Sequence, residues 1–199
     1  MGETPFHFDR DIQQYCFAKI LDSDVAAAIL ARAQDVVKFV STELGIKDHP
    51  RVRWIRPASP EQARATLKRH VLDRSVAERN PHFFRYCSDV EKACTPCDAG
   101  LNEIWIRAEL VGSPELECVA AHEVRHAWQK SSYPEVFADD CRAEGDATPY
   151  GYELAARYLD GGNRLTDEAR KWIEGERSEA ERNFHEKCPG VLFEVISTS

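Results

Sequence analysis

The sequence contains no apolar run that approaches the roughly 20 residues needed to span a membrane. Its first ten residues lack the basic segment followed by an apolar segment that marks a secretory signal. Lysine and arginine are scattered along the chain and the formal net charge is −8, so no basic surface is expected to attract nucleic acid or an anionic membrane. We therefore expect a soluble, cytoplasmic protein with no nucleic-acid partner and no membrane partner.

Internal repeats and low-complexity linkers are also missing from the 199 residues. Hydrophobic residues make up 43% of the chain and charged residues 30%, which is ordinary for one globular domain with a real core. The sequence therefore predicts a single domain over residues 1–199.

The chain has seven cysteines, an odd number, and without a secretory signal they indicate reduced thiols or metal ligands more than a disulfide framework. Cys94 and Cys97 have the spacing of paired thiolate ligands, and Cys87 lies near them in sequence. No fourth donor is evident, so loop thiols without a metal are the simpler interpretation. Cys118 and Cys141 are expected to fill small gaps in the packing.

Apolar spacing and turn residues predict an α+β fold that is mostly helical, with a small antiparallel or mixed sheet. Pro149 predicts a kink near residues 145 to 149, because its ring clashes with the carbonyl group four residues earlier. The helices are expected from Ser23 or Asp24 to Gly45, over 59–72, over 113–129, over 139–160 and from Thr166 to Cys188; strands are expected over 52–56, 104–110 and 191–196, and a turn over 131–134.

The helix over 113–129 contains the pentapeptide His122-Glu123-Val124-Arg125-His126. Ser113 can cap this helix and Pro114 suits its first position. Residues four apart in a helix are about 40° apart around the axis and about 6 Å apart along it. His122 and His126 therefore face the same way and can hold one metal ion.

Helical phase places Glu123 in the apolar arc of this helix, with the two histidines at the edge of the same arc. A carboxylate in such an arc is costly unless a partner compensates it. Two zinc ligands beside a glutamate general base are what H-E-x-x-H chemistry requires. A chance pentapeptide on an ordinary surface helix is the alternative. The arc is formed by Leu116, Val119, Ala120, Val124 and Ala127, and Arg125, Gln129 and Cys118 lie opposite.

A catalytic zinc usually has three protein ligands, and the next helix offers Asp139, Asp140, Glu144 and Asp146. The pentapeptide followed by a helix containing Glu144-Gly145-Asp146-Ala147 resembles the gluzincin group of zinc metallopeptidases, including minimal gluzincin-like domains of bacteria and phages. The resemblance covers residues 103 to 160 and implies a zincin-like fold.

In that group the glutamate of E-x-x-A completes the metal site, which implies Glu144 as the third ligand, with Asp146 as the alternative. Thr148 stands where many relatives have an aspartate that supports a histidine. Gluzincin-like enzymes often use a tyrosine or histidine to stabilise the oxyanion, and Tyr150 is preferred over Tyr133 and Tyr152 for this role. Filling the core is the alternative role for these tyrosines.

The sequence thus predicts a zinc metallopeptidase in which Zn2+ is held by His122, His126 and Glu144, and Glu123 activates a metal-bound water. Peptides or proteins are the expected substrate, bound in extended form by adding a strand to the segment 104–110. One alternative is a non-catalytic regulatory or sensor domain that uses the same His/Glu site together with the loop of Cys87, Cys94 and Cys97. A binding protein without any metal is another.

Overall fold

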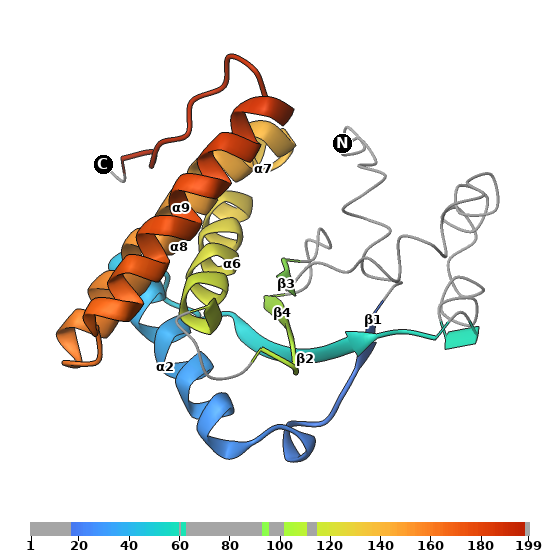
Figure 1. The fold of residues 1–199 in the computed structure, drawn as a ribbon. Coiled ribbons are helices and arrows are strands. Elements are labelled where there is room, and N and C mark those ends of the chain that lie inside the picture. The colour runs from blue at the N-terminus through green and yellow to red at the C-terminus, as the bar shows by residue number, and fades with distance from the viewer. Residues whose placement is uncertain (1–16, 60, 63–92, 96–101, 111–114, 198–199) are drawn as a thin grey trace.

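The computed structural model describes residues 17–59, 61–62, 93–95, 102–110 and 115–197 (Figure 1). These residues form a mostly helical fold with a small sheet, which confirms the α+β class. In chain order the elements are β1 (Phe17–Lys19), the 3-10 turn η1 (Asp22–Asp24), α2 (Ala27–Glu43), β2 (Arg51–Pro57), β3 (Ala93–Cys94), β4 (Glu103–Arg107), α6 (Glu115–Ser132), α7 (Pro134–Phe137), α8 (Asp140–Gly161) and α9 (Asp167–Lys187).

The sheet is mixed, with the strand order β1-β2-β4-β3. β2 and β4 are parallel, and their pairing runs from Arg51 opposite Glu103 to Ile55 opposite Arg107. β1 is antiparallel to β2, and β3 is antiparallel to β4. β4 therefore lies between two strands, so the expectation that the strand over 104–110 takes up an extended peptide is wrong. In the part of the sheet that the structure describes, β3 forms the edge next to it.

The helices cover one face of the sheet in successive layers (Figure 1). α2 and α6 pack on the sheet, where alternating residues such as Trp54 of β2 and Ile106 of β4 point toward Val36 and Leu116 in one core. α8 packs against α6, and α9 packs against α8. α6 is thus enclosed by the sheet on one side and by α8 on the other, and both of its faces are buried.

Two of the predicted helix starts are confirmed by their caps. The Asp139 side chain accepts a hydrogen bond from Arg142 N at the start of α8, and Thr166 accepts one from Ala169 N at the start of α9. At the predicted start near residue 59, Ser59 N donates to Gln62 Oε1 and Gln62 N donates to Ser59 Oγ, as in a capping box.

The predicted start of α2 at Ser23 or Asp24 is wrong. Both residues belong to η1, and Val25 after them has an extended backbone. α2 begins only after Ala26, which makes no side-chain capping bond. Its end is as expected, because Gly45 follows with φ of 66°, the left-handed conformation that favours glycine.

The second half of the chain differs from the prediction in two places. α6 continues through Ser132, and α7 begins at Pro134, so the predicted turn is mostly helical. Pro149 lies inside α8, and the kink that it predicts stays a prediction. Residues 191–196 form no strand, although the backbone of Ile196 makes hydrogen bonds to the side chains of α6 and α8 described below.

Cys141 and Cys188 form a disulfide that joins the first turn of α8 to the end of α9. The two cysteines are 47 residues apart in sequence. For this pair the prediction of reduced thiols is wrong. The expectation that Cys141 fills a packing gap is therefore wrong. Cys118 does fill such a gap, because it is a buried free thiol packed with Ala155 and Leu159, and burial raises its pKa.

Within the described ranges, no helix combines the length and the apolar character that crossing a membrane demands.

Candidate metal centre

The first two candidate ligands lie on adjacent turns of α6. His122 Nε2 and His126 Nε2 are 2.9 Å apart, and the two rings meet edge to face. The spacing of four residues places both rings on the face of α6 that packs against α8. Ser113 and Pro114, which were expected to start this helix, lie outside the described residues.

The third candidate ligand comes from α8. Glu144 Oε1 lies 3.1 Å from His126 Nε2, and Glu144 Oε2 lies 3.4 Å from His122 Nε2. One ligand atom from each of the three residues lies within 4.8 Å of the others. The Glu144 side chain is 43% exposed, so this group opens to solvent on the side of α8.

The donor set and its spacing fit a zinc ion. Two imidazole nitrogens and a carboxylate are ligands that zinc takes in catalytic sites, at about 2.0 to 2.2 Å. Tetrahedral bonds of that length place neighbouring donors about 3.3 Å apart, and the three observed separations lie between 2.9 and 3.4 Å. The three side chains therefore hold positions that one ion can share.

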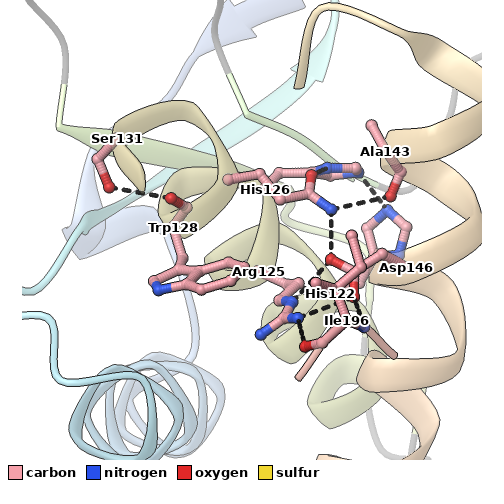
Figure 2. Close-up of polar contacts among 9 residues, drawn as sticks. His122, Arg125, His126, Trp128, Ser131, Ala143, Asp146 and Ile196 are labelled. Atoms are coloured by element: carbon pink, nitrogen blue, oxygen red, sulfur yellow. Dashed lines mark hydrogen bonds and ion pairs between the residues drawn. The ribbon is translucent and has the colours of Figure 1, made fainter. Parts of the chain in front are cut away.

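Asp146, the alternative ligand, is used elsewhere. Its carboxylate accepts two hydrogen bonds of 2.8 Å from Arg125, which is completely buried, and a third of 2.6 Å from Gln129 Nε2. Figure 2 shows Asp146 facing Arg125. Asp146 therefore braces the interface of α6 and α8, and Glu144 is the acidic side chain of α8 that the histidines face.

Arg125 and Gln129 lie opposite the apolar arc of α6, as the helical phase indicates, but the structure buries both completely. The Arg125 guanidinium also lies between two aromatic rings, 3.9 Å from the centre of Trp128 and 4.4 Å from that of Tyr150. This polar face is buried because α8 covers it. A single helix cannot reveal such a covering partner.

Glu123 contacts the segment that follows β3. It is 4% exposed, and the Thr95 hydroxyl lies 2.7 Å from its Oε2 and 2.9 Å from its backbone oxygen. Thr95 directly follows β3, so the edge of the sheet supplies a partner for the carboxylate that the sequence places in an apolar arc. The sequence does not indicate a role for Thr95, because no local pattern connects it with Glu123, 28 residues away.

Two glycines bring α8 close to its neighbours. A Cβ atom on Gly151 would lie 2.8 Å from the carbonyl oxygen of Cys118 and 3.0 Å from His122 Cβ. A Cβ atom on Gly145 would lie 2.5 Å from the carbonyl oxygen of Leu192. Gly151 thus permits the short distance between α6 and α8, and Gly145 permits the close approach of the segment that contains Leu192.

Tyr150, the preferred oxyanion candidate, lies in the core. It is 6% exposed, its ring faces Arg125, and burial raises its pKa to about 12. Burial likewise raises the pKa of Tyr152 to about 12, whereas Tyr133 is partly exposed and packs on Trp128. The surroundings of Tyr150 favour the packing role, and its catalytic assignment stays a prediction.

Thr148 lies near Glu144, with its hydroxyl 3.4 Å from Glu144 Oε2. It therefore contacts the third candidate ligand. The cysteine loop, for which thiols without a metal are the simpler interpretation, lies mostly outside the described residues. Cys87 and Cys97 are not among them, and only the backbone of Cys94 is described, in β3.

A cavity of about 510 Å³ lies beside the end of α6, and Thr95, Ala127 and Trp128 are among the residues that line it. Its wall also includes residues 44–48, which link α2 to β2. Since Thr95 both lines the cavity and bonds Glu123, the buried carboxylate adjoins this space through one side chain.

No protein-family model, curated protein or solved structure matches the chain.

Proposed function

We propose that the protein is a zinc-dependent peptidase of the zincin type, with gluzincin-like ligands His122, His126 and Glu144. The observation that carries the proposal is the convergence of these three donors, two from α6 and one from α8, beside a buried glutamate on α6. An imidazole nitrogen and a carboxylate oxygen 3.1 Å apart repel one another unless a proton or a metal ion lies between them. A zinc ion satisfies all three groups at once.

Each residue of the site has a separate task in this proposal. Zinc, when bound, supplies a Lewis acid that polarises the substrate carbonyl and acidifies water. The Glu123 carboxylate accepts a proton from the attacking water and passes it to the leaving amine nitrogen as the peptide bond breaks. Thr95 orients Glu123 during this transfer through its hydroxyl group.

Peptides are the proposed substrate because the site lies beside a sheet edge. β3 pairs with β4 on one side, and Thr95, which follows β3, contacts Glu123. An extended peptide that added to β3 would pass next to the proposed general base. The cavity beside Thr95 gives a substrate side chain a place to bind.

The proposal is tested by measuring zinc content and peptidase activity of the wild type and of Glu123→Gln. We expect the variant to retain zinc and to lose about 10³-fold in turnover, because it cannot accept a proton. Glu153→Gln is the matched control, since Glu153 is an exposed glutamate on α8. Wild-type protein that contains no metal after purification and zinc addition, or a Glu123→Gln variant with full activity, would contradict the proposal.

One observation favours the second candidate, a metal-binding domain without catalytic activity that serves regulation or sensing. Thr95 satisfies Glu123, so the buried carboxylate has a structural partner even if it transfers no proton. In that case His126→Ala reduces folding stability and zinc content, while no peptidase activity is detected in any variant. Metal content and activity measured together separate the two candidates.

The cytoplasmic location predicted from the sequence is challenged by the disulfide. Structural disulfides persist in oxidising compartments and are rare in a reducing cytoplasm. The bond between Cys141 and Cys188 therefore favours an oxidising environment for this chain. Counting free thiols in protein purified without reductant from its native cells would decide between these locations.

A further inference from the structure

All the groups that face the Asp146 carboxylate are hydrogen-bond donors. Its Oδ1 accepts from Arg125 Nη2 and from the backbone N of Ile196, at 2.8 and 2.7 Å. Its Oδ2 accepts from Arg125 Nε and from Gln129 Nε2, at 2.8 and 2.6 Å. Arg125 Nη2 also donates to the Ile196 carbonyl oxygen, so the C-terminal segment closes the network (Figure 2). Asp146 therefore acts as an acceptor toward every one of these partners.

This arrangement determines how the Gln129 amide is turned. A side-chain amide has one end that donates and one that accepts. The end that faces Asp146 Oδ2 also faces the carbonyl oxygen of Ala143, at 3.1 Å, and both of these groups are acceptors. Only the amide nitrogen satisfies both, so Gln129 Oε1 must point the other way, toward His126.

The orientation of Gln129 in turn determines where His126 carries its proton. His126 Nδ1 lies 2.8 Å from Gln129 Oε1, which can only accept, so Nδ1 must donate. We propose that Gln129, held by Asp146, is a positioning residue that fixes the His126 proton on Nδ1 and keeps Nε2 available to a metal ion. This inference rests on the proposed metal site for its purpose, although the tautomer itself exists without metal.

The effect matters because a neutral imidazole binds metal through the nitrogen that lacks a proton, and the hydrogen bond of the other nitrogen selects which one that is. Without Gln129, the His126 proton can move to Nε2, the atom that faces His122 and Glu144. Zinc must then displace this proton, and the ring is free to rotate. Groups in this supporting position typically change metal affinity by about 10- to 100-fold when removed.

The first measurement uses wild-type protein freed of metal and labelled with 15N-histidine. Long-range 1H–15N correlation spectra distinguish the two neutral tautomers, and the His126 signals are assigned by their loss in His126→Asn. We expect His126 to carry its proton on Nδ1 in the metal-free wild type. A His126 ring with no proton on Nδ1 would overturn the inference. This measurement requires neither a folded Gln129 variant nor bound zinc.

The second measurement compares Gln129→Met, which keeps the length of the side chain but loses both hydrogen-bonding ends, with Gln34→Met on the exposed side of α2. We expect Gln129→Met to lose the Nδ1 proton signature and to bind zinc about 10- to 100-fold more weakly in competition with a chromophoric chelator. Gln34→Met should match the wild type in both readings. Zinc affinity within twofold of the wild type in Gln129→Met would overturn the inference.

The two proposals fail in different ways. If the wild type shows the Nδ1 tautomer but binds no zinc, the metal site is wrong and the positioning of His126 by Gln129 stands. If zinc binds and Gln129→Met retains both affinity and tautomer, the peptidase proposal stands and the positioning role of Gln129 is wrong.

Discussion

The two faces of α6 hold their polar side chains by different means. Toward α8, His126 is backed by Gln129, Asp146 and Arg125, and the backbone of Ile196 closes this network. Toward the sheet, Glu123 is contacted by the hydroxyl group of Thr95, which follows β3. The α8 face thus has a connected network that spans three segments of the chain, and the sheet face has a contact that joins α6 to the end of β3.

This difference matches the two tasks that the site requires. A metal ligand has to remain in one position and one protonation state, which a network of partners with fixed donor and acceptor roles can enforce. A general base has to gain and lose a proton, and a hydroxyl group can accept as well as donate a hydrogen bond, so the Thr95 contact is compatible with both states of the Glu123 carboxyl group. Substitutions that disrupt the α8 face should therefore lower metal affinity and the free energy of unfolding. Substitutions that disrupt the sheet face should lower turnover alone.

The largest change to the α8 face is expected from removing the disulfide with Cys141→Ser and Cys188→Ser. Cys141 lies one turn before Glu144, and Cys188 precedes the segment that bonds Asp146. We expect the free energy of unfolding in urea to fall by about 2 to 4 kcal/mol, with weaker zinc binding. Reductant should lower the unfolding free energy and the zinc affinity of the wild type in the same way, and it should leave both quantities unchanged in the double variant. Free thiols at every cysteine in protein purified under oxidising conditions would contradict this.

Gly151→Ala tests the α8 face of α6 at the point where Gly151 contacts Cys118 and His122. The added methyl group meets the Cys118 carbonyl oxygen and His122 Cβ, so α8 must move away from α6 and carry Glu144 with it. We expect a loss of about 1 to 3 kcal/mol in unfolding free energy and a lower zinc affinity. In Gly175→Ala, the control on α9, no atom lies within 4 Å, and stability should rise by about 0.8 to 1 kcal/mol. Equal effects of the two substitutions would show that the close contact is unimportant.

Thr95→Val is the smallest perturbation and affects the sheet face only. The valine keeps the shape of threonine but cannot donate to Glu123, so the carboxylate loses this hydrogen bond. Losing this contact should lower turnover about 10-fold, which corresponds to about 1.4 kcal/mol. Zinc affinity should not change, and Thr95→Ser should retain most of the activity. A drop in zinc affinity in Thr95→Val would mean that the two faces are not independent.

Most of the helices and the candidate ligands were predictable because their signals are local. The caps at Asp139 and Thr166 and the glycine after α2 depend on a few neighbouring residues. The spacing of His122 and His126 follows from helical geometry alone. Gln129 lies three residues after His126 on the same helix, so the sequence spacing predicts that the two side chains are neighbours. The spacing does not reveal that Gln129 also bonds Asp146.

The predicted start of α2 was wrong because the residues with capping chemistry do not adjoin the helix. Ser23 and Asp24 have the chemistry of capping residues, but the extended backbone at Val25 separates them from the helix. Val25 packs into the core, and α2 starts after Ala26 without a side-chain cap.

By itself, the sequence determined a mostly helical α+β chain, two histidines on one helical face and a glutamate in an apolar arc. Only the tertiary structure decided that Glu144 faces the histidines, that Asp146 braces Arg125 and Gln129, and that Thr95 meets Glu123. It also paired Cys141 with Cys188 and placed β4 between two strands. Helical periodicity acts between residues three or four apart, whereas the partner of a buried charge is selected by which distant element covers it.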